Sequence, residues 1–212
     1  MNAVEPDRSG GSDGSGGETP PDWAELLLRL VLVRKDRDAV SGDLLEAYRD
    51  TMVPTRGHAA ADAWYVRQVA GFLWRATWPW ALLFSGQFIA RGAYDMLVPT
   101  TDFHVRAEWS TYVGASTFLL VGLWAAWRTG SLSAGIVVTA ITSQVAAVFS
   151  VVGVSLLLVI MHDAETMRLI SRSGGLGEAY FLPFMMIIPA LVIGMVAGAV
   201  GSLTRRIARG TA

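Results

Sequence analysis

The sequence predicts an all-α membrane protein, in which four transmembrane helices follow a small N-terminal module of three helices. Two observations indicate this class. Residues 132–161 contain no Asp, Glu, Lys or Arg, and about 20 mostly apolar residues suffice to cross the hydrocarbon core as a helix. Residues 1–75, in contrast, hold 21 of the 35 charged residues of the 212-residue chain. A polar N-terminal part is therefore expected in front of an apolar membrane part.

The N-terminal part divides into a tail and a module. Residues 1–20 include a Gly/Ser-rich run with no apolar surface to bury, so we expect a disordered tail. Residues 21–75 are expected to form three short amphipathic helices with a small common core, the third running over 58–74. In the first helix, apolar residues recur with the spacing of one buried helix face. These residues are Trp23, Leu26, Leu27, Leu30 and Val31.

Four apolar stretches fill residues 76–204, the expected transmembrane domain. The expected spans are 76–98, 109–127, 132–161 and 179–203. Tryptophan side chains favour the headgroup region of a bilayer, and Trp109 and Trp127 stand at the two ends of the second span. Residues 205–212 form a short basic tail after the last span.

The distribution of arginine predicts the orientation of these spans. With four spans, the module, the connection that contains Arg128 and the tail that contains Arg205 and Arg206 all lie on one side. Loops rich in Lys and Arg remain in the cytoplasm. We therefore expect a cytoplasmic module and a multi-pass protein of the plasma membrane, with both termini in the cytoplasm.

Two charged residues lie within the first expected span. Arg91 and Asp95 are four residues apart, so they share a helix face and can form an intramembrane ion pair. Charged side chains inside a membrane often mark a substrate or proton path. Because Pro99 places both residues in the last turns of the helix, we favour an interfacial position, with Arg91 extending toward the headgroups. A path is the alternative.

Small and polar residues in the later spans indicate how the helices pack. Small residues recur at every fourth position of the fourth span, and such stripes let helix backbones approach closely. We expect Gly194 and Gly198 to pack inside one bundle, and the alternative is that they join two copies into a homo-oligomer. Gln144 in the third span is expected to form a hydrogen bond between helices rather than to catalyse a reaction.

The composition excludes several kinds of site. The chain has no Cys, which excludes disulfides, thiolate metal sites and Cys nucleophiles, and its net charge of −1 gives no basic surface for nucleic acid. None of the three histidines lies at the centre of a span. We expect His104 and His162, in two outer loops, to be solvated, and a metal site that they share is the weaker alternative. No catalytic triad or intramembrane carboxylate pair is present. We expect no enzyme, no catalytic residue, no cofactor and no metal.

The second and third helices of the module carry charged candidates for docking a partner. Asp43 and Glu46 are three residues apart on the expected exposed face, and Arg67 on the next helix is able to pair with them. A partner-docking face is one interpretation. The other is a fold signature, since exposed carboxylates are usually solvated.

The same segment carries a family resemblance. Residues 37–49, Arg-Asp-Ala-Val-Ser-Gly-Asp-Leu-Leu-Glu-Ala-Tyr-Arg, and the later block 64–68, Trp-Tyr-Val-Arg-Gln, resemble the permease prefix domain 2. That module precedes certain bacterial ABC-type permeases. It also occurs in small stand-alone membrane proteins, often encoded beside PadR-type transcriptional regulators, and the four-span part resembles these stand-alone members. The resemblance implies no catalytic residues.

These observations lead to three functional hypotheses. We expect a non-enzymatic protein of a bacterial inner membrane, whose module docks or regulates a protein partner, either an ABC-type permease or a PadR-type regulatory system. The first alternative is a small transporter or transporter subunit, which would use Arg91, Asp95 and the polar third span. The second is a membrane-tethered anti-sigma-like regulator, in which residues 22–75 sequester a soluble factor.

Overall fold

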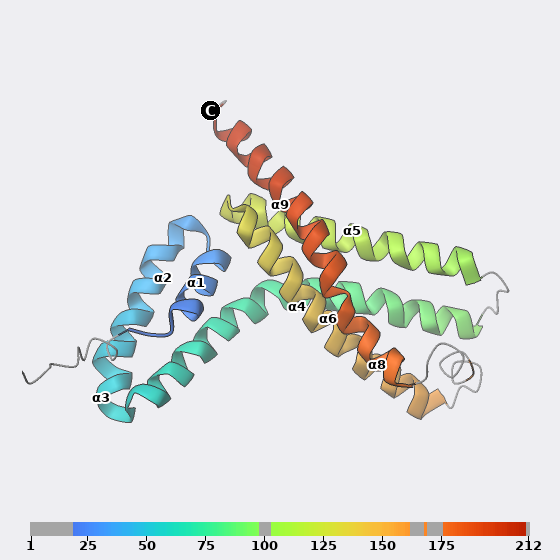
Figure 1. Cartoon of the computed structure of the whole chain (residues 1–212), viewed down its shortest axis with the longest axis horizontal. Coiled ribbons are helices and arrows are strands. Elements are labelled where there is room, and N and C mark those ends of the chain that lie inside the picture. Colours follow the sequence, from blue (N-terminus) through green and yellow to red (C-terminus); the bar gives the residue numbers. More distant parts are fainter. Residues whose placement is uncertain (1–18, 98–102, 162–167, 169–175, 211–212) are drawn as a thin grey trace, which may run out of the picture.

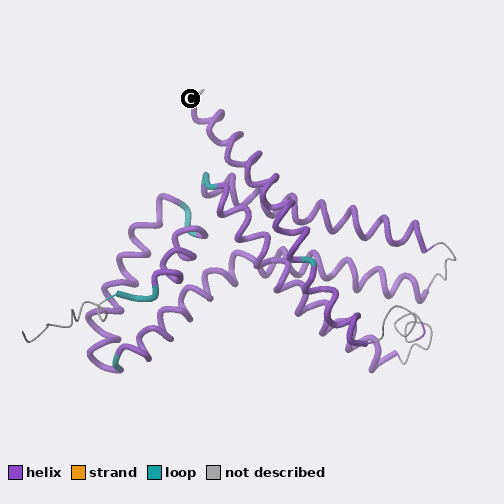
Figure 2. Tube along the Cα trace, in the orientation of Figure 1, coloured by secondary structure: helices purple, strands orange, loops and turns teal. Residues whose placement is uncertain are grey.

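The computed structural model describes residues 19–97, 103–161, 168 and 176–210, and within these ranges the chain is helical with no strand (Figure 2). The all-α prediction is confirmed for this part of the chain. The helices are α1 (Asp22–Val31), α2 (Arg34–Glu46), the π-helical turn η2 (Ala47–Met52), α3 (Val53–Arg56), α4 (His58–Leu97), α5 (Phe103–Thr129), α6 (Leu132–Met161), α8 (Leu176–Met185) and α9 (Ile187–Gly210).

A single helix, α4, joins the module to the bundle. The sequence predicted two helices here, 58–74 in the module and 76–98 as the first span, but the structure has 40 continuous helical residues. Pro79 lies within α4, where its ring and missing N–H favour a kink rather than an end. Figure 1 shows α4 changing direction between a first half beside α1 and a second half beside α5. One continuous helix therefore connects the module with the bundle.

The module has its own core, in which α1, η2 and the first half of α4 meet. Its buried residues are Ala24, Leu28, Tyr48, Ala61, Tyr65 and Val69. The rings of Tyr48 and Tyr65 pack edge to face, with centroids 6.0 Å apart at 86°. The predicted buried face of α1 is wrong: Trp23 is 56% and Leu26 59% exposed.

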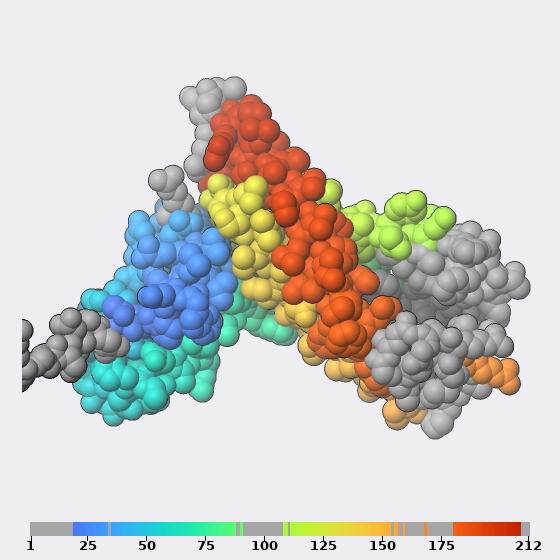
Figure 3. Space-filling model, viewed as in Figure 1, coloured from blue at the N-terminus to red at the C-terminus, as the bar shows by residue number. Residues whose placement is uncertain are grey.

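The second half of α4 forms a bundle with α5, α6, α8 and α9. The closest pairs are α5 with α9 and α6 with α9, and Figure 3 shows α6 and α9 in direct contact along much of their length. Large apolar side chains cover the outside of each helix. The exposed examples include Leu82, Leu83, Leu119, Leu120, Val148, Val152, Leu156, Ile188, Val192, Val196 and Val200.

Two of the four expected spans qualify by length and hydropathy. Among the residues described, they are Leu132–Gly153, with mean hydropathy 2.0, and Tyr180–Ala208, with 2.3. The expected span 109–127 does not qualify, because Ser, Thr, Gly, Trp and Tyr lower its hydropathy although it carries no charge. Length and composition alone indicate membrane association only weakly, since the core helix of a soluble protein passes the same test. The core helix of a soluble protein is mostly buried, whereas only 39% and 28% of the most apolar stretches of these two helices are buried in this chain.

The module rests against one end of the bundle. Val31, at the end of α1, packs with Trp80 and Trp124 on the bundle core, and the two indole rings are 5.7 Å apart. The turn between α5 and α6 and the C-terminal end of α9 lie toward this end in Figure 1, whereas α4 and α6 end, and α5 and α8 begin, at the other. The helices thus alternate in direction.

Candidate functional site: the polar centre and acidic face of the module

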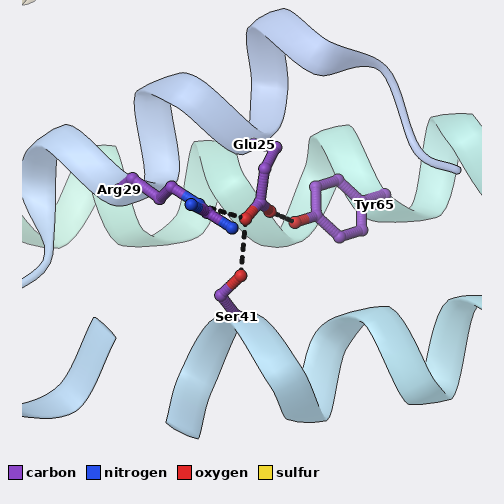
Figure 4. Close-up of polar contacts among 4 residues, drawn as sticks. All are labelled: Glu25, Arg29, Ser41 and Tyr65. Carbon is purple, nitrogen blue, oxygen red and sulfur yellow. Dashed lines mark hydrogen bonds and ion pairs between the residues drawn. The ribbon is translucent and has the colours of Figure 1, made fainter. Parts of the chain in front are cut away.

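A partly buried carboxylate holds the three main helices of the module together. Glu25 of α1 accepts hydrogen bonds at Oε1 from Arg29 Nε (2.6 Å) and from the Ser41 hydroxyl of α2 (2.5 Å). The Tyr65 hydroxyl of α4 donates to Glu25 Oε2. Figure 4 shows the three donors converging on the carboxylate from three helices. The side chain of Glu25 is only 19% exposed, so these bonds replace most of its hydration.

The environment of Glu25 stabilises its charged form. Burial alone would raise the pKa of Glu25, but the hydrogen bonds from Ser41, Tyr65 and Arg29 outweigh it and lower the pKa below the ordinary value of 4.5. Burial and the bond to Glu25 raise the pKa of Tyr65 far above its usual range, so its hydroxyl remains a donor. The centre is thus a structural ionic site that joins three helices.

A second tyrosine repeats this arrangement on the other side of the core. The Tyr48 hydroxyl donates to Asp62 Oδ1 at 2.6 Å. Burial and this bond raise the pKa of Tyr48 to about 12. Tyr48 is 1% exposed, so it contributes both apolar packing and a satisfied polar tip.

The acidic candidates lie on the outer surface of the module. Asp43 and Glu46 are exposed at the end of α2, and with Asp50 and Thr51 of η2 they line a shallow depression of about 260 Å³. Arg67 is also exposed, but no ion pair joins it to either carboxylate in the described part of the chain. A π-helical turn such as η2 is rare and often occurs at a functional site. Most of the residues that line this depression are charged or polar.

The structure does not describe the side chains of Arg91 and Asp95. Both residues lie in the last turns of α4, which ends at Leu97. The predicted ion pair between them involves side chains outside the part that the structure describes. The side chains of His104 and His162 also lie outside them. No group of three or more His, Asp or Glu side chains that could hold a metal ion occurs among the residues described.

Gly194 and Gly198 lie in the interior of the bundle. An ideal Cβ on Gly194 would be 3.1 Å from Thr139 Cβ of α6, and one on Gly198 would be 2.8 Å from the Leu132 carbonyl oxygen. An ideal Cβ on Gly122 of α5 would be 3.3 Å from the Gly194 Cα atom, and one on Gly135 of α6 would be 2.8 Å from the Gly198 Cα atom. Both α9 glycines are buried within one chain, so this geometry does not offer them to a second copy.

Gln144 forms a hydrogen bond between helices, as the sequence predicted. Its Nε2 donates to the Phe184 carbonyl oxygen of α8 at 3.1 Å. Phe184 lies beside the interruption between α8 and α9 at Met186. Pro189 has no N–H to donate to the Met185 carbonyl oxygen, which favours this interruption. Backbone carbonyls at such an interruption need a partner within a membrane, and the Gln144 side chain supplies one.

The polar centre at Glu25 was missed by the sequence analysis. The signal was Glu25 itself, an acidic residue placed among the apolar residues of the first helix, and such side chains are usually solvated. Ala24 and Leu28 are the residues of α1 that are completely buried, and this rotation of the helix carries the neighbouring Glu25 toward Ser41 and Tyr65.

Comparison of the chain with protein-family models, with curated proteins and with solved structures finds no match. Function is therefore inferred from the geometry above and from the sequence motifs.

Proposed function

We propose that this chain is a non-enzymatic, four-span protein of a bacterial inner membrane, whose N-terminal module docks a protein partner in the cytoplasm. The partner class follows from the resemblance to permease prefix domain 2: an ABC-type permease or a PadR-type regulatory system. The observation that carries the proposal is the acidic depression of Asp43, Glu46 and Asp50, which lies on a folded module held at one end of an apolar bundle.

The exposed surface of the bundle supports the membrane part of the proposal. Soluble monomers rarely expose large contiguous apolar areas. The exposed side chains of α8 and α9 are apolar from Phe181 to Leu203, and α4 and α5 expose leucines and tryptophans. Because α4 and α5 pack beside α6 and α9 and are long enough to span, we propose that all four helices cross the bilayer.

The charge of the module supports the docking part. Asp43, Glu46 and Asp50 have no ion-pair partner among the described residues, so their mutual repulsion is relieved when a cation approaches. A partner with Lys or Arg side chains in the facing position is complementary to this surface, and such complementarity mainly raises specificity and the association rate. Arg67 then belongs to the solvated surface rather than to an internal pair.

Affinity purification from mild detergent tests the proposal. The full chain is compared with the triple variant Asp43→Asn, Glu46→Gln, Asp50→Asn and with Asp38→Asn, a charge removal elsewhere on the exposed surface of α2. We expect a discrete co-purifying protein that the triple variant loses and Asp38→Asn retains. Equal recovery with all three chains contradicts the acidic docking face. Recovery of the chain in the soluble fraction without detergent contradicts the membrane assignment.

The transporter alternative has weaker support. The backbones of α5, α6 and α9 approach closely at Gly122, Gly194 and Gly198, where an ideal Cβ would lie within 3.5 Å of a neighbouring helix. This close packing leaves no room for a pore between these three helices where the structure describes them. Flux into liposomes that depends on Asp95 would favour the transporter.

A further inference from the structure

The bundle end that meets the module carries three arginines on two helices. Arg205 of α9 donates from Nη1 to the Arg128 carbonyl oxygen at the end of α5, at 2.7 Å. This bond joins the two helix ends, and Arg206 is the next residue along α9. Arg128 and Arg206 are exposed and have no carboxylate partner in the described part of the chain. The edge between α5 and α9 therefore carries concentrated positive charge.

The local backbone is shaped to hold these arginines in place. Gly130 follows α5 with φ of +79°, a conformation that favours glycine, and an ideal Cβ there would be 2.8 Å from Arg205 Nη1. The Arg128 guanidinium lies over the Trp124 ring, 5.3 Å from its centroid, which is a cation–π contact. The Trp124 ring thus contributes to the position of Arg128, and the Arg128 carbonyl oxygen to that of Arg205.

Apolar side chains lie directly beside this charge. Trp127, Leu203 and Ile207 are exposed on α5 and α9, and Figure 1 shows the last turns of α9 projecting beyond the ends of α5 and α6. Guanidinium groups next to exposed apolar and indole side chains match the boundary between headgroups and acyl chains. The complementary molecule has a phosphate beside long apolar chains.

We propose that the edge formed by Arg128, Arg205 and Arg206 binds the phosphodiester headgroup of an anionic phospholipid, whose acyl chains lie along Leu203 and Ile207. The inference rests on the proposed membrane location. Basic clusters at the cytoplasmic ends of transmembrane helices attract anionic headgroups. The lipid bound there lies next to Trp124, and hence next to the contact between the module and the bundle.

Native mass spectrometry of the full chain tests the site. The chain is equilibrated in detergent micelles with equal amounts of phosphatidylglycerol and phosphatidylcholine, with and without inorganic phosphate. We expect retention of phosphatidylglycerol over phosphatidylcholine by on the order of tenfold, from about two exposed arginines. In Arg128→Gln, Arg206→Gln the preference falls to nearly one, whereas Arg56→Gln, an exposed arginine of the module, keeps it. Inorganic phosphate leaves the bound lipid in place.

Three outcomes overturn the proposal: equal retention of both lipids by the unaltered chain, an unchanged preference in the double variant, or displacement of the lipid by inorganic phosphate. Thermal unfolding of both variants in the same micelles shows that they are folded. Equal retention of both lipids contradicts only the headgroup site. A chain that retains neither lipid and is soluble without detergent contradicts the proposed membrane location as well.

Discussion

The Tyr65 hydroxyl donates a hydrogen bond to Glu25 Oε2, joining α1 to α4 across 40 residues of sequence. The same carboxylate accepts a hydrogen bond from the Ser41 hydroxyl of α2. Since α4 continues into the bundle, this one carboxylate fixes α1 and α2 to a helix that reaches the far end of the bundle. The stability of the module is therefore expected to depend on Glu25.

The first prediction concerns the loss of one donor to this carboxylate. Tyr65→Phe keeps the ring packing but leaves Glu25 Oε2 without its partner, and we expect the free energy of unfolding to fall by about 1–3 kcal/mol. Thermal unfolding of the full chain, followed by circular dichroism, measures the change. Arg29→Gln is the control, because Arg29 is 57% exposed and exposed ion pairs contribute less than about 1 kcal/mol. Equal losses in the two variants would contradict the assigned roles.

The second prediction concerns acid. The pKa of Glu25 is lowered in the folded chain from its ordinary 4.5. Its contribution to stability is therefore fully present above about pH 4.5 and is lost as the pH falls through the lowered folded pKa. Unfolding by urea at a series of pH values from 7 to 3 measures this loss. Glu25→Gln is expected to be less stable at pH 7 and to lose less stability below pH 4.5; a variant with an unchanged acid dependence would contradict the prediction.

The third prediction uses the same substitution at two glycines. Gly198→Ala places a methyl group 2.8 Å from the Leu132 carbonyl oxygen, so α6 and α9 must separate, and we expect destabilisation of about 1–3 kcal/mol. Gly71→Ala lies within α4 with nothing inside 4 Å of the new methyl group, and we expect stabilisation by about 0.5–1 kcal/mol. The unfolding temperatures of both variants, measured in one detergent, show whether each substitution stabilises or destabilises the chain. Destabilisation by Gly71→Ala, or none by Gly198→Ala, would disagree with the packing.

The fourth prediction concerns the interruption between α8 and α9. Gln144→Leu removes the donor to the Phe184 carbonyl oxygen, and we expect a loss of about 1 kcal/mol, typical of a hydrogen bond between membrane helices. Amide hydrogen exchange of residues 183–190 is expected to quicken in this variant. Val148→Ala, one turn along α6 and exposed, should leave the exchange unchanged. Similar exchange in both variants would remove the proposed role of Gln144.

Sequence patterns predicted the helical class and the interhelical bond of Gln144, because apolar run length and an isolated polar residue within a run are local signals. The continuity of α4 was not predicted, since Pro79 is compatible with either a kink or an end, and neighbouring helices decide between them. The buried face of α1 was also wrong. Apolar residues occur on both sides of this helix, and the choice of face depends on Ser41 and Tyr65, which are distant in sequence.

Site-specific photo-crosslinking in native membranes tests the docking claim most directly. A photoreactive residue is placed at Glu46, in the acidic depression, and separately at Asp38, on the exposed surface of α2. The account predicts one discrete protein adduct from position 46, lost when Asp43 and Asp50 are replaced by Asn, and no such adduct from position 38. An identical adduct pattern from both positions, or no protein adduct from position 46, would contradict it.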